Sequence, residues 1–352
     1  MTHIIRSRSP VRISFAGGGT DVSPYTEKHG GAVVNAAINQ YAYTTFIDRK
    51  DGKIILDSLD LNKRVEYKTI NKIKLDGNLD LTKAVILFFK RKFPHFFKKL
   101  TKGFEIHTSC EIPPRSGLGS SAAMFASIIG IFNRMAKEYR IDSYEIAELA
   151  YSLEREKLKN AGGRQDQYAS VFGGINFIEF KGHDFVRVNP LKIKEDYLLE
   201  LESNLILINL GARSNSGDII NDQIKNLKNN KSSINATHKT KQLANQVKYS
   251  LIQGDFIKFG KLLDKGWQEK KKFSSKISNP ELDNIYRDLK TAGAIGGKIL
   301  GAGGGGHMLL YCKPGKKLHV LQKTIKLGLN HVPFTFDHKG LTTWTINGKY
   351  EF

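Results

Sequence analysis

Hydrophobic and polar positions alternate along the first part of the chain. Residues 11–48 and 53–67 are rich in β-branched and aromatic side chains, with glycine-rich breaks and period-two stretches such as residues 41–46. This alternation is typical of half-buried strands, so both segments are predicted to form strands. Four shorter apolar segments predict further strands, at residues 172–180, 205–210, 307–311 and 341–346.

Helical spacing follows in the middle of the chain. Residues 120–139 and 143–160 combine good helix formers with apolar positions at helical intervals, and Asp142 or Ser143 is placed to cap the second segment. Residues 280–292 predict another helix, and residues 216–265 predict a mostly polar one. Within the latter, residues 226–241 carry little apolar content, which indicates a solvated loop or helix face.

Mixed strands and helices over 352 residues predict an α+β protein of two lobes, at roughly 150 residues per domain. A polar stretch that opens at Asn189 and Pro190 and runs to residue 200 is the predicted boundary. The lobes are accordingly expected at residues 1–190 and 191–352.

Composition points to anionic partners. The chain has 55 Lys and Arg against 34 Asp and Glu, a formal net charge of +21. Such an excess attracts either a nucleic acid backbone or phosphorylated small molecules, and charge alone does not choose between them.

The two cysteines, Cys110 and Cys312, provide neither a disulfide framework nor the clustered ligands of a zinc site. A reducing cytoplasm is therefore the expected location. Residues 1–8 lack an apolar leader, and apolar runs such as residues 84–89 fall far short of the ~20 residues that span a bilayer. We expect an unexported protein with no membrane partner.

The most informative motif is a glycine- and serine-rich segment at residues 113–123, directly before a predicted helix. Glycines allow a backbone to approach phosphate oxygens, and a helix start offers free N–H groups and partial positive charge. A tight turn with a capping serine would explain only one glycine and one serine. The predicted phosphate-binding residues are Pro114, Gly117, Leu118, Gly119, Ser120, Ser121 and Ala122.

Two further glycine-rich segments accompany it. Residues 301–306 match G-x-G-x-x-G, but a dinucleotide site must open a helix and an apolar strand follows here. Five glycines in six positions indicate backbone pressed against a partner, with a flexible hairpin as the alternative. Residues 9–21 form a predicted strand that enters a glycine turn and presents Thr20 and Asp21, either as a local turn or as a ligand contact.

Two carboxylates are candidates for chemistry. Glu154 lies on the second predicted helix, and Asp166 follows Gly162 and Gly163. Phosphoryl transfer needs magnesium, positive charge and a carboxylate at the attacking hydroxyl, which Glu154, Asp166, Ser121 and Arg12 could supply. A solvated helix charge and a helix cap are the alternatives, and spacing alone leaves them open.

Together the three segments resemble, in order and spacing, the three motifs of the GHMP kinases, the small-molecule kinase family of galactokinase, homoserine kinase and mevalonate kinase. The resemblance covers nearly the whole chain, and GLGSSAA is its most specific part. Residues 10–35 resemble the sugar branch of fucokinase and D-glycero-D-manno-heptose 7-phosphate kinase most closely. Residues 211–214 and the compact length look most like the heptose kinase type.

The resemblance implies an N-terminal lobe like the second domain of ribosomal protein S5, a ferredoxin-like C-terminal lobe, and ATP in the cleft between them. It implies that Asp166 and Arg12 are catalytic and that Ser121 and Glu154 hold Mg²⁺. The implied sugar-phosphate contacts are Thr20, Asp21, Gly163, Arg213, Gly303, Gly304 and Gly305.

The implied reaction moves the ATP γ-phosphoryl group to the anomeric hydroxyl of a heptose 7-phosphate. Gly18 and Gly19 stand where galactokinase has a Glu-His pair, which puts galactose-specific contacts in doubt. A fucokinase- or galactokinase-like sugar 1-kinase is the alternative. Arg213, ahead of Arg164 and Arg8, is the expected ligand of the substrate's own phosphate, and a homodimer is left open.

A nucleic-acid-binding protein is the rival from another class, because residues 90–99 interleave lysines with phenylalanines. An amphipathic helix end with Phe inward and Lys outward explains the pattern better, since no known nucleic-acid-binding motif accompanies it. No nucleic acid partner is therefore expected.

Overall fold

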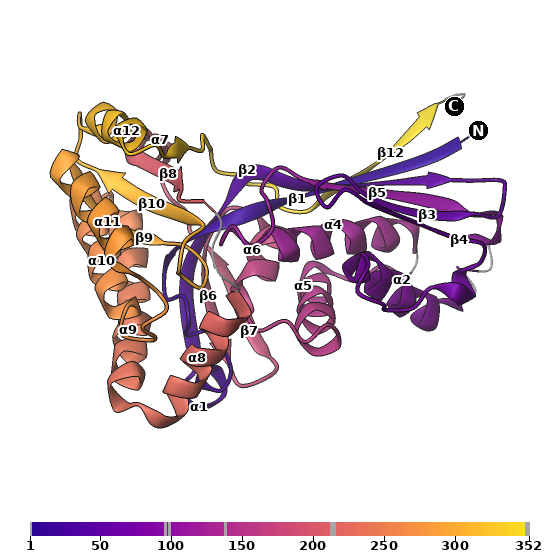
Figure 1. The fold of residues 1–352 in the computed structure, drawn as a ribbon, viewed down its shortest axis with the longest axis horizontal. Coiled ribbons are helices and arrows are strands. Elements are labelled where there is room, and N and C mark those ends of the chain that lie inside the picture. The colour runs from indigo at the N-terminus through magenta and orange to yellow at the C-terminus, as the bar shows by residue number, and fades with distance from the viewer. Residues whose placement is uncertain (1, 95–96, 98–99, 137–138, 212–215, 349–352) are drawn as a thin grey trace.

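The computed structural model describes residues 2–94, 97, 100–136, 139–211 and 216–348. These residues form a large sheet and a small sheet, with helices packed on both (Figure 1). The large sheet has the order β12-β1-β2-β5-β3-β4, and β6 pairs with β2 and β7; all pairs are antiparallel except β3 with β5. Its strands are β1 (Thr2–Ala16), β2 (Gly31–Asp48), β3 (Ile54–Ser58), β4 (Lys63–Tyr67), β5 (Phe104–Cys110), β6 (Ile175–Lys181), β7 (Phe185–Pro190) and β12 (Thr342–Gly348).

The small antiparallel sheet has the order β11-β8-β10-β9. Its strands are β8 (Leu205–Asn209), β9 (Ala294–Ile299), β10 (His307–Cys312) and β11 (Asn330–His331). Successive side chains of β10 belong alternately to two hydrophobic clusters: Leu309 joins the core shared with the large sheet, whereas Met308 and Leu310 join the second cluster. The small sheet is therefore buried on both faces.

Helices cover one face of the large sheet and pack around the small one (Figure 1). They are α1 (Tyr25–His29), α2 (Asp80–Lys92), α4 (Ser120–Met135), α5 (Ser143–Tyr151), α6 (Gln165–Phe172), α7 (Glu195–Asn204), α8 (Ser216–Asn229), α9 (Lys231–Gln253), α10 (Phe256–Lys270), α11 (Pro280–Ala292) and α12 (Lys317–Lys326). Short 3-10 turns occupy Ile70–Lys72 and Leu100–Lys102, and a π-helix occupies Ser152–Lys157.

The predicted α+β class is confirmed, and most predicted elements are present. The segment at residues 143–160 is α-helical only to Tyr151, and the π-helix continues it to Lys157. Its N-cap is Asp142, which forms a capping box with Glu145. The polar stretch at residues 190–200 contains the start of α7 rather than a bare linker. Residues 226–241, predicted as a solvated loop or helix face, belong to α8 and α9, both of which bury part of their surface.

The predicted lobe boundary at residue 190 stays a prediction, but strand β12 lies on the other side of it from the rest of the C-terminal half. Residues 342–348 pair with β1 in the large sheet, so the last described strand lies in the N-terminal half of the molecule.

Within the described ranges, no helix combines the length and the apolar character needed to cross a bilayer.

The aromatic side chains next to the basic stretch point inward. Phe89 and Phe97 stack on Phe132 of α4, with ring centroids 5.3 and 5.8 Å away, and both are buried. Lys92 of the same segment is exposed. This is the packing of an amphipathic helix end on the core beneath the large sheet.

Candidate active site

A cavity of about 460 Å³ has walls from both halves of the chain. The N-terminal half contributes the end of β1, the segment before α4 and the start of α6, whereas the C-terminal half contributes α8, α10 and the end of β9. Eleven of the predicted site residues line it: Arg12, Asp21, Pro114, Gly117, Gly119, Ser120, Ser121, Ala122, Glu154, Gly163 and Asp166. Segments that are distant in sequence thus meet at one place.

The start of α4 forms one wall of this cavity. Gly117 and Gly119 have φ values of 87° and 78°, which glycine adopts without strain, and Gly119 caps the helix without a side chain. Ser120, Ser121 and Ala122 of the first turn line the cavity. The first turn has no acidic side chain, so its free N–H groups and partial positive charge can serve an anion.

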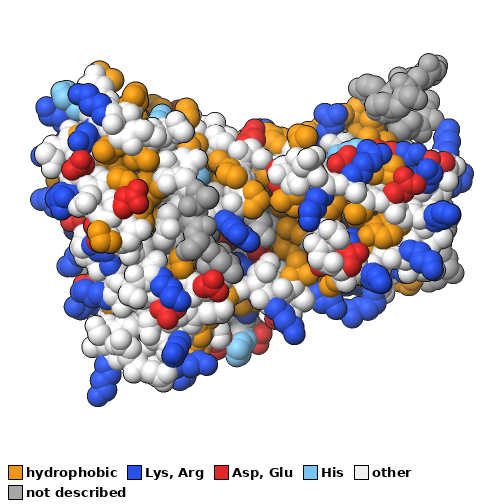
Figure 2. All heavy atoms as spheres, in the orientation of Figure 1, with side chains coloured by type: hydrophobic (Ala, Val, Ile, Leu, Met, Phe, Trp, Pro, Cys, Tyr) orange, Lys and Arg blue, Asp and Glu red, His pale blue; other side chains and the backbone are white. Residues whose placement is uncertain are grey.

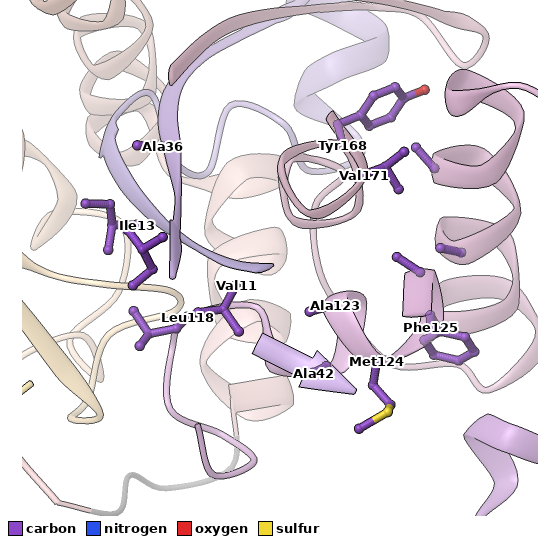
Figure 3. Packing of buried hydrophobic residues seen from close by; sticks show 14 of the residues in the cluster. Val11, Ile13, Ala36, Ala42, Leu118, Ala123, Met124, Phe125, Tyr168 and Val171 are labelled. Carbon is purple, nitrogen blue, oxygen red and sulfur yellow. The ribbon is translucent and has the colours of Figure 1, made fainter. Parts of the chain in front are cut away.

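Leu118 has a different place from the one expected. Its side chain is fully buried and lies with Val11 and Ile13 in the core (Figure 3). Its backbone N–H donates to the hydroxyl of Ser116, and its carbonyl accepts from the N–H of Arg12. Both main-chain groups are therefore occupied, and Leu118 anchors the loop instead of lining the cavity.

Arg12 and Asp166 form the central ion pair of the site. Nε and Nη2 of Arg12 lie 2.8 and 2.6 Å from Oδ1 of Asp166, and Nη1 donates to the carbonyl of Gly117 at 2.6 Å. The Arg12 side chain is 4 % exposed and that of Asp166 is 19 % exposed. A Cβ on Gly119 would lie 3.4 Å from Asp166, so the start of α4 passes close beside this carboxylate.

Asp21 lies buried at the same end of the cavity. Oδ1 accepts from the N–H of Gly19, and Oδ2 accepts from the backbone and side-chain N–H groups of Gln165. Burial and the nearby charge of Asp166 raise the pKa of Asp21. Gly163 is required here because a Cβ at that position would be 2.1 Å from the Asp21 carboxylate.

Thr20 does not line the cavity. Its hydroxyl donates to the carbonyl of Ala32 and accepts from the N–H of Ala32, both at 3.0 Å, and the residue is fully buried. In this structure Thr20 joins the turn after β1 to the start of β2, and Asp21 is the member of the pair that lines the cavity. A sugar contact at Thr20 stays a prediction.

Glu154 occupies the π-helix that continues α5. It is buried, with Oε2 accepting from the Gln167 amide at 2.7 Å and Oε1 3.4 Å from Arg155. Ser121 and Glu154 both line the cavity, although no group of three or more His, Cys, Asp and Glu gathers anywhere in the described residues. Mg²⁺ commonly takes one or two protein oxygens and fills its other positions with phosphate and water, so this donor set fits the ion.

The C-terminal glycine segment meets the cavity with its first residues only. Gly301 and Ala302 line it, whereas Gly303, Gly304 and Gly305 are absent from its lining. A Cβ added to Gly303 would lie 2.9 Å from Ile277. The backbone N–H of Gly304 donates to the carbonyl of Ile277. Gly303 and Gly304 therefore pack on their own lobe in this structure, and the substrate contacts expected at Gly303, Gly304 and Gly305 stay predictions.

The arginines expected for the substrate phosphate are not in the described cavity wall. Arg213 lies outside the described residues. Arg164 pairs with Glu148 at 3.7 Å and covers the ring of Tyr151. Arg8 covers the ring of Tyr41.

Sequence reasoning missed several residues that line the cavity. Lys270 and Lys298 come from the C-terminal half, and Arg155 neighbours Glu154. The lining also includes the apolar side chains Leu79, Leu81, Ile112 and Met124. A lysine in a strand gives no sequence signal of burial, and the apolar set is brought together only by the fold.

Comparison with known proteins agrees with this arrangement. The family model described as GHMP kinases N terminal domain matches residues 80–174, and the one described as GHMP kinases C terminal matches residues 247–324. A D-glycero-alpha-D-manno-heptose 7-phosphate kinase of Campylobacter jejuni is 39 % identical over 343 residues, 97 % of this chain and 99 % of that protein. The chain belongs to the GHMP kinases.

Other relatives are similar over most of this chain. The crystal structure of a D-glycero-D-manno-heptose 1-phosphate kinase from Bacteriodes thetaiotaomicron has a TM-score of 0.82 and 33 % identity, covering 98 % of this chain and all of the other. An L-fucokinase/L-fucose-1-P guanylyltransferase of Bacteroides fragilis is 28 % identical over 88 % of this chain but only 35 % of its own length. The predicted two-lobed GHMP kinase fold is confirmed, as is an ATP-dependent kinase with an alcohol group as acceptor.

Substitution of Thr20 in this GHMP kinase distinguishes its packing on Ala32 from the predicted sugar contact. Thr20→Val removes both hydrogen bonds to Ala32 and should lower the free energy of unfolding by ~1–3 kcal/mol, as measured by urea denaturation. Thr291→Val, at an exposed helical position, is the matched control. An unchanged stability with a raised KM for the sugar substrate would instead restore Thr20 as a substrate contact.

Proposed function

We propose that the chain transfers the γ-phosphoryl group of ATP to the anomeric hydroxyl of D-glycero-D-manno-heptose 7-phosphate, giving the 1,7-bisphosphate for nucleotide-activated heptose synthesis. The observation that carries the proposal is the Arg12–Asp166 ion pair beside the start of α4, within one cavity. The 39 % identity to a heptose 7-phosphate kinase supports the choice of sugar.

The lining suits the two substrates. Its apolar side chains suit the adenine base, and the start of α4 suits the triphosphate, because backbone N–H groups and a helix N-terminus bind phosphate oxygens. The lining at Asp21, Gly163 and Gln165 offers acceptors and donors for sugar hydroxyls; Oε1 of Gln165 and the hydroxyl of Ser14 are buried without a hydrogen-bond partner among the described residues.

Charge along the wall suits a phosphorylated sugar. Five basic side chains line the cavity, namely Arg12, Arg115, Arg155, Lys270 and Lys298, against the four acids Asp21, Asp60, Glu154 and Asp166. Over the view in Figure 2, by contrast, basic side chains are spread across the surface. Arg213 remains a candidate ligand of the 7-phosphate, and Arg155 and Lys270 join it. A cytoplasmic location and a homodimer remain predictions.

In the proposed reaction Asp166 accepts the proton of the anomeric hydroxyl. The sugar oxygen forms a bond to the γ-phosphorus while the bond from that phosphorus to the β-phosphate oxygen breaks, and ADP leaves. Arg12 holds Asp166 in place through Oδ1 and adds positive charge beside the transferring group. Ser121 and Glu154 would hold Mg²⁺, which supplies positive charge to the phosphate oxygens when bound.

The choice of acceptor is tested by ADP release. The named relatives differ in the position of the existing phosphate, so heptose 7-phosphate and heptose 1-phosphate should be compared, with L-fucose, galactose and mannose alongside. We expect the highest kcat/KM with the 7-phosphate. A higher value with the 1-phosphate or with an unphosphorylated sugar would contradict the proposed acceptor.

Asp166→Asn tests the proton acceptor. The variant keeps the size of the side chain but removes its basicity, so turnover should fall by ~10²-fold or more while ATP binding stays near wild type. Steady-state kinetics and calorimetric ATP binding provide the two readouts, and exposed Asp184→Asn is the matched control. Wild-type turnover in Asp166→Asn would remove this carboxylate from the mechanism.

Glu154→Gln tests the metal ligand. Loss of its charge should raise the Mg²⁺ concentration needed for half-maximal rate, measured by titration at saturating substrates. The control is Glu156→Gln, an exposed neighbour in the same π-helix. If the Glu154→Gln titration coincides with that of wild type, Mg²⁺ is held elsewhere.

A further inference from the structure

Lys298 carries a buried amine into the cavity from the C-terminal half of the chain. It lies near the end of β9, behind Gly296 and Gly297, where added Cβ atoms would be within 2.3 Å of neighbouring carbonyls. These glycines let β9 pack tightly between α10 and β10. Lys298 is only 5 % exposed, yet it lines the cavity.

Its ammonium group is poorly satisfied by the protein. Among the described residues its hydrogen bond goes to the carbonyl of Phe15, at 3.4 Å, a long contact for a group with three donors. Arg12 and Asp21 act on it from the N-terminal half, and burial together with Arg12 lowers the pKa of Lys298 to about 8. Asp21 already accepts from Gly19 and Gln165.

Two buried cations that influence each other are costly unless an anion joins them. Arg12 has Asp166 and the carbonyl of Gly117 as acceptors, and Gly117 belongs to the segment that suits the triphosphate. Lys298 approaches the same region from the other lobe and has donors to spare. An anionic group between the two lobes would complete its hydrogen bonds.

We propose that Lys298 is a catalytic residue whose ammonium donates to the γ-phosphoryl group of ATP, opposite the start of α4. This assignment rests on the proposed function and names a contact of the same site. During transfer, negative charge on the phosphoryl oxygens is stabilised by fixed donors. The proton of the sugar hydroxyl still passes to Asp166, and Lys298 keeps its own proton throughout.

Nucleotide binding tests this contact without the sugar. Calorimetry should compare the Mg²⁺ complexes of AMP-PNP, which has a third phosphate, and of ADP, which does not. Lys298→Met should lower the affinity for AMP-PNP by about tenfold or more, as expected for loss of a charge-assisted hydrogen bond. The affinity for ADP should stay unchanged. Lys298→Arg, which keeps the charge, should restore most of the affinity.

The matched control is Lys290→Met on α11, whose amine pairs with Asp264 at 2.9 Å and is outside the cavity lining. It should bind both nucleotides as wild type does. Thermal melting verifies that each variant is folded, and Lys298→Arg keeps the test valid if Lys298→Met is unstable. Equal losses for ADP and AMP-PNP, or no loss for either, would overturn the proposal.

A pH series gives a second readout. Wild-type affinity for AMP-PNP should fall as pH rises through about 8, where free Lys298 loses its charge, and Lys298→Arg should not show this decline. The charged groups that act on Lys298 are Arg12 and Asp21. The elements packed against β9 carry further titratable groups: Lys258, Lys261, Asp264, Lys265, Glu269 and Lys270 on α10, Glu281, Asp283, Arg287, Asp288 and Lys290 on α11, and His307 on β10. The same decline in Lys298→Arg would assign it to another group.

The acceptor assay separates the two proposals. If heptose 7-phosphate is not phosphorylated but Lys298→Met discriminates AMP-PNP from ADP, the sugar is wrong and the lysine contact stands. If Lys298→Met raises only the KM for the sugar phosphate, the amine serves the 7-phosphate and the γ-phosphoryl assignment fails.

Discussion

One guanidinium joins the parts of the chain on which the site depends. Arg12 reaches Asp166 at the start of α6 and the carbonyl of Gly117, while its backbone N–H reaches the carbonyl of Leu118. A buried cation is tolerated only when its donors are satisfied, so strand β1, the segment before α4 and the start of α6 must keep this mutual arrangement. The helix start and the carboxylate are thereby positioned by the same side chain.

Much of the fold could be predicted where one local signal dominates. Helix α11 begins and ends where its sequence indicates, because Asn279 caps it, Pro280 opens it and Gly293 follows it. Helix α9 was harder to predict because small polar side chains carry part of its packing: Ser233, Thr237 and Thr240 are buried. A pattern of hydrophobic positions cannot show such a face.

The candidate site likewise has a part that could be predicted from sequence and a part that could not. Its glycine-rich segments could be selected from sequence because each motif is local, whereas Glu154 and Asp166 could be selected only through the resemblance to a known family, since spacing alone leaves them open. The packing of Thr20 on Ala32 and of Gly303 and Gly304 on Ile277 could not be predicted, because these contacts are made with residues distant in sequence. Lys298 depends entirely on how the two halves meet, which no local spacing encodes.

Strand β12 has a consequence for the order in which the molecule assembles. It covers the edge of β1, although the paired residues Arg8 and Thr342 stand almost at opposite ends of the chain. During synthesis on the ribosome, the backbone N–H and C=O groups of this edge stay unpaired until residues 342–348 emerge, and other strands can pair with them. A nascent chain that stalls before this point would expose an unpaired strand edge that can aggregate. Chaperone protection would matter most in that interval.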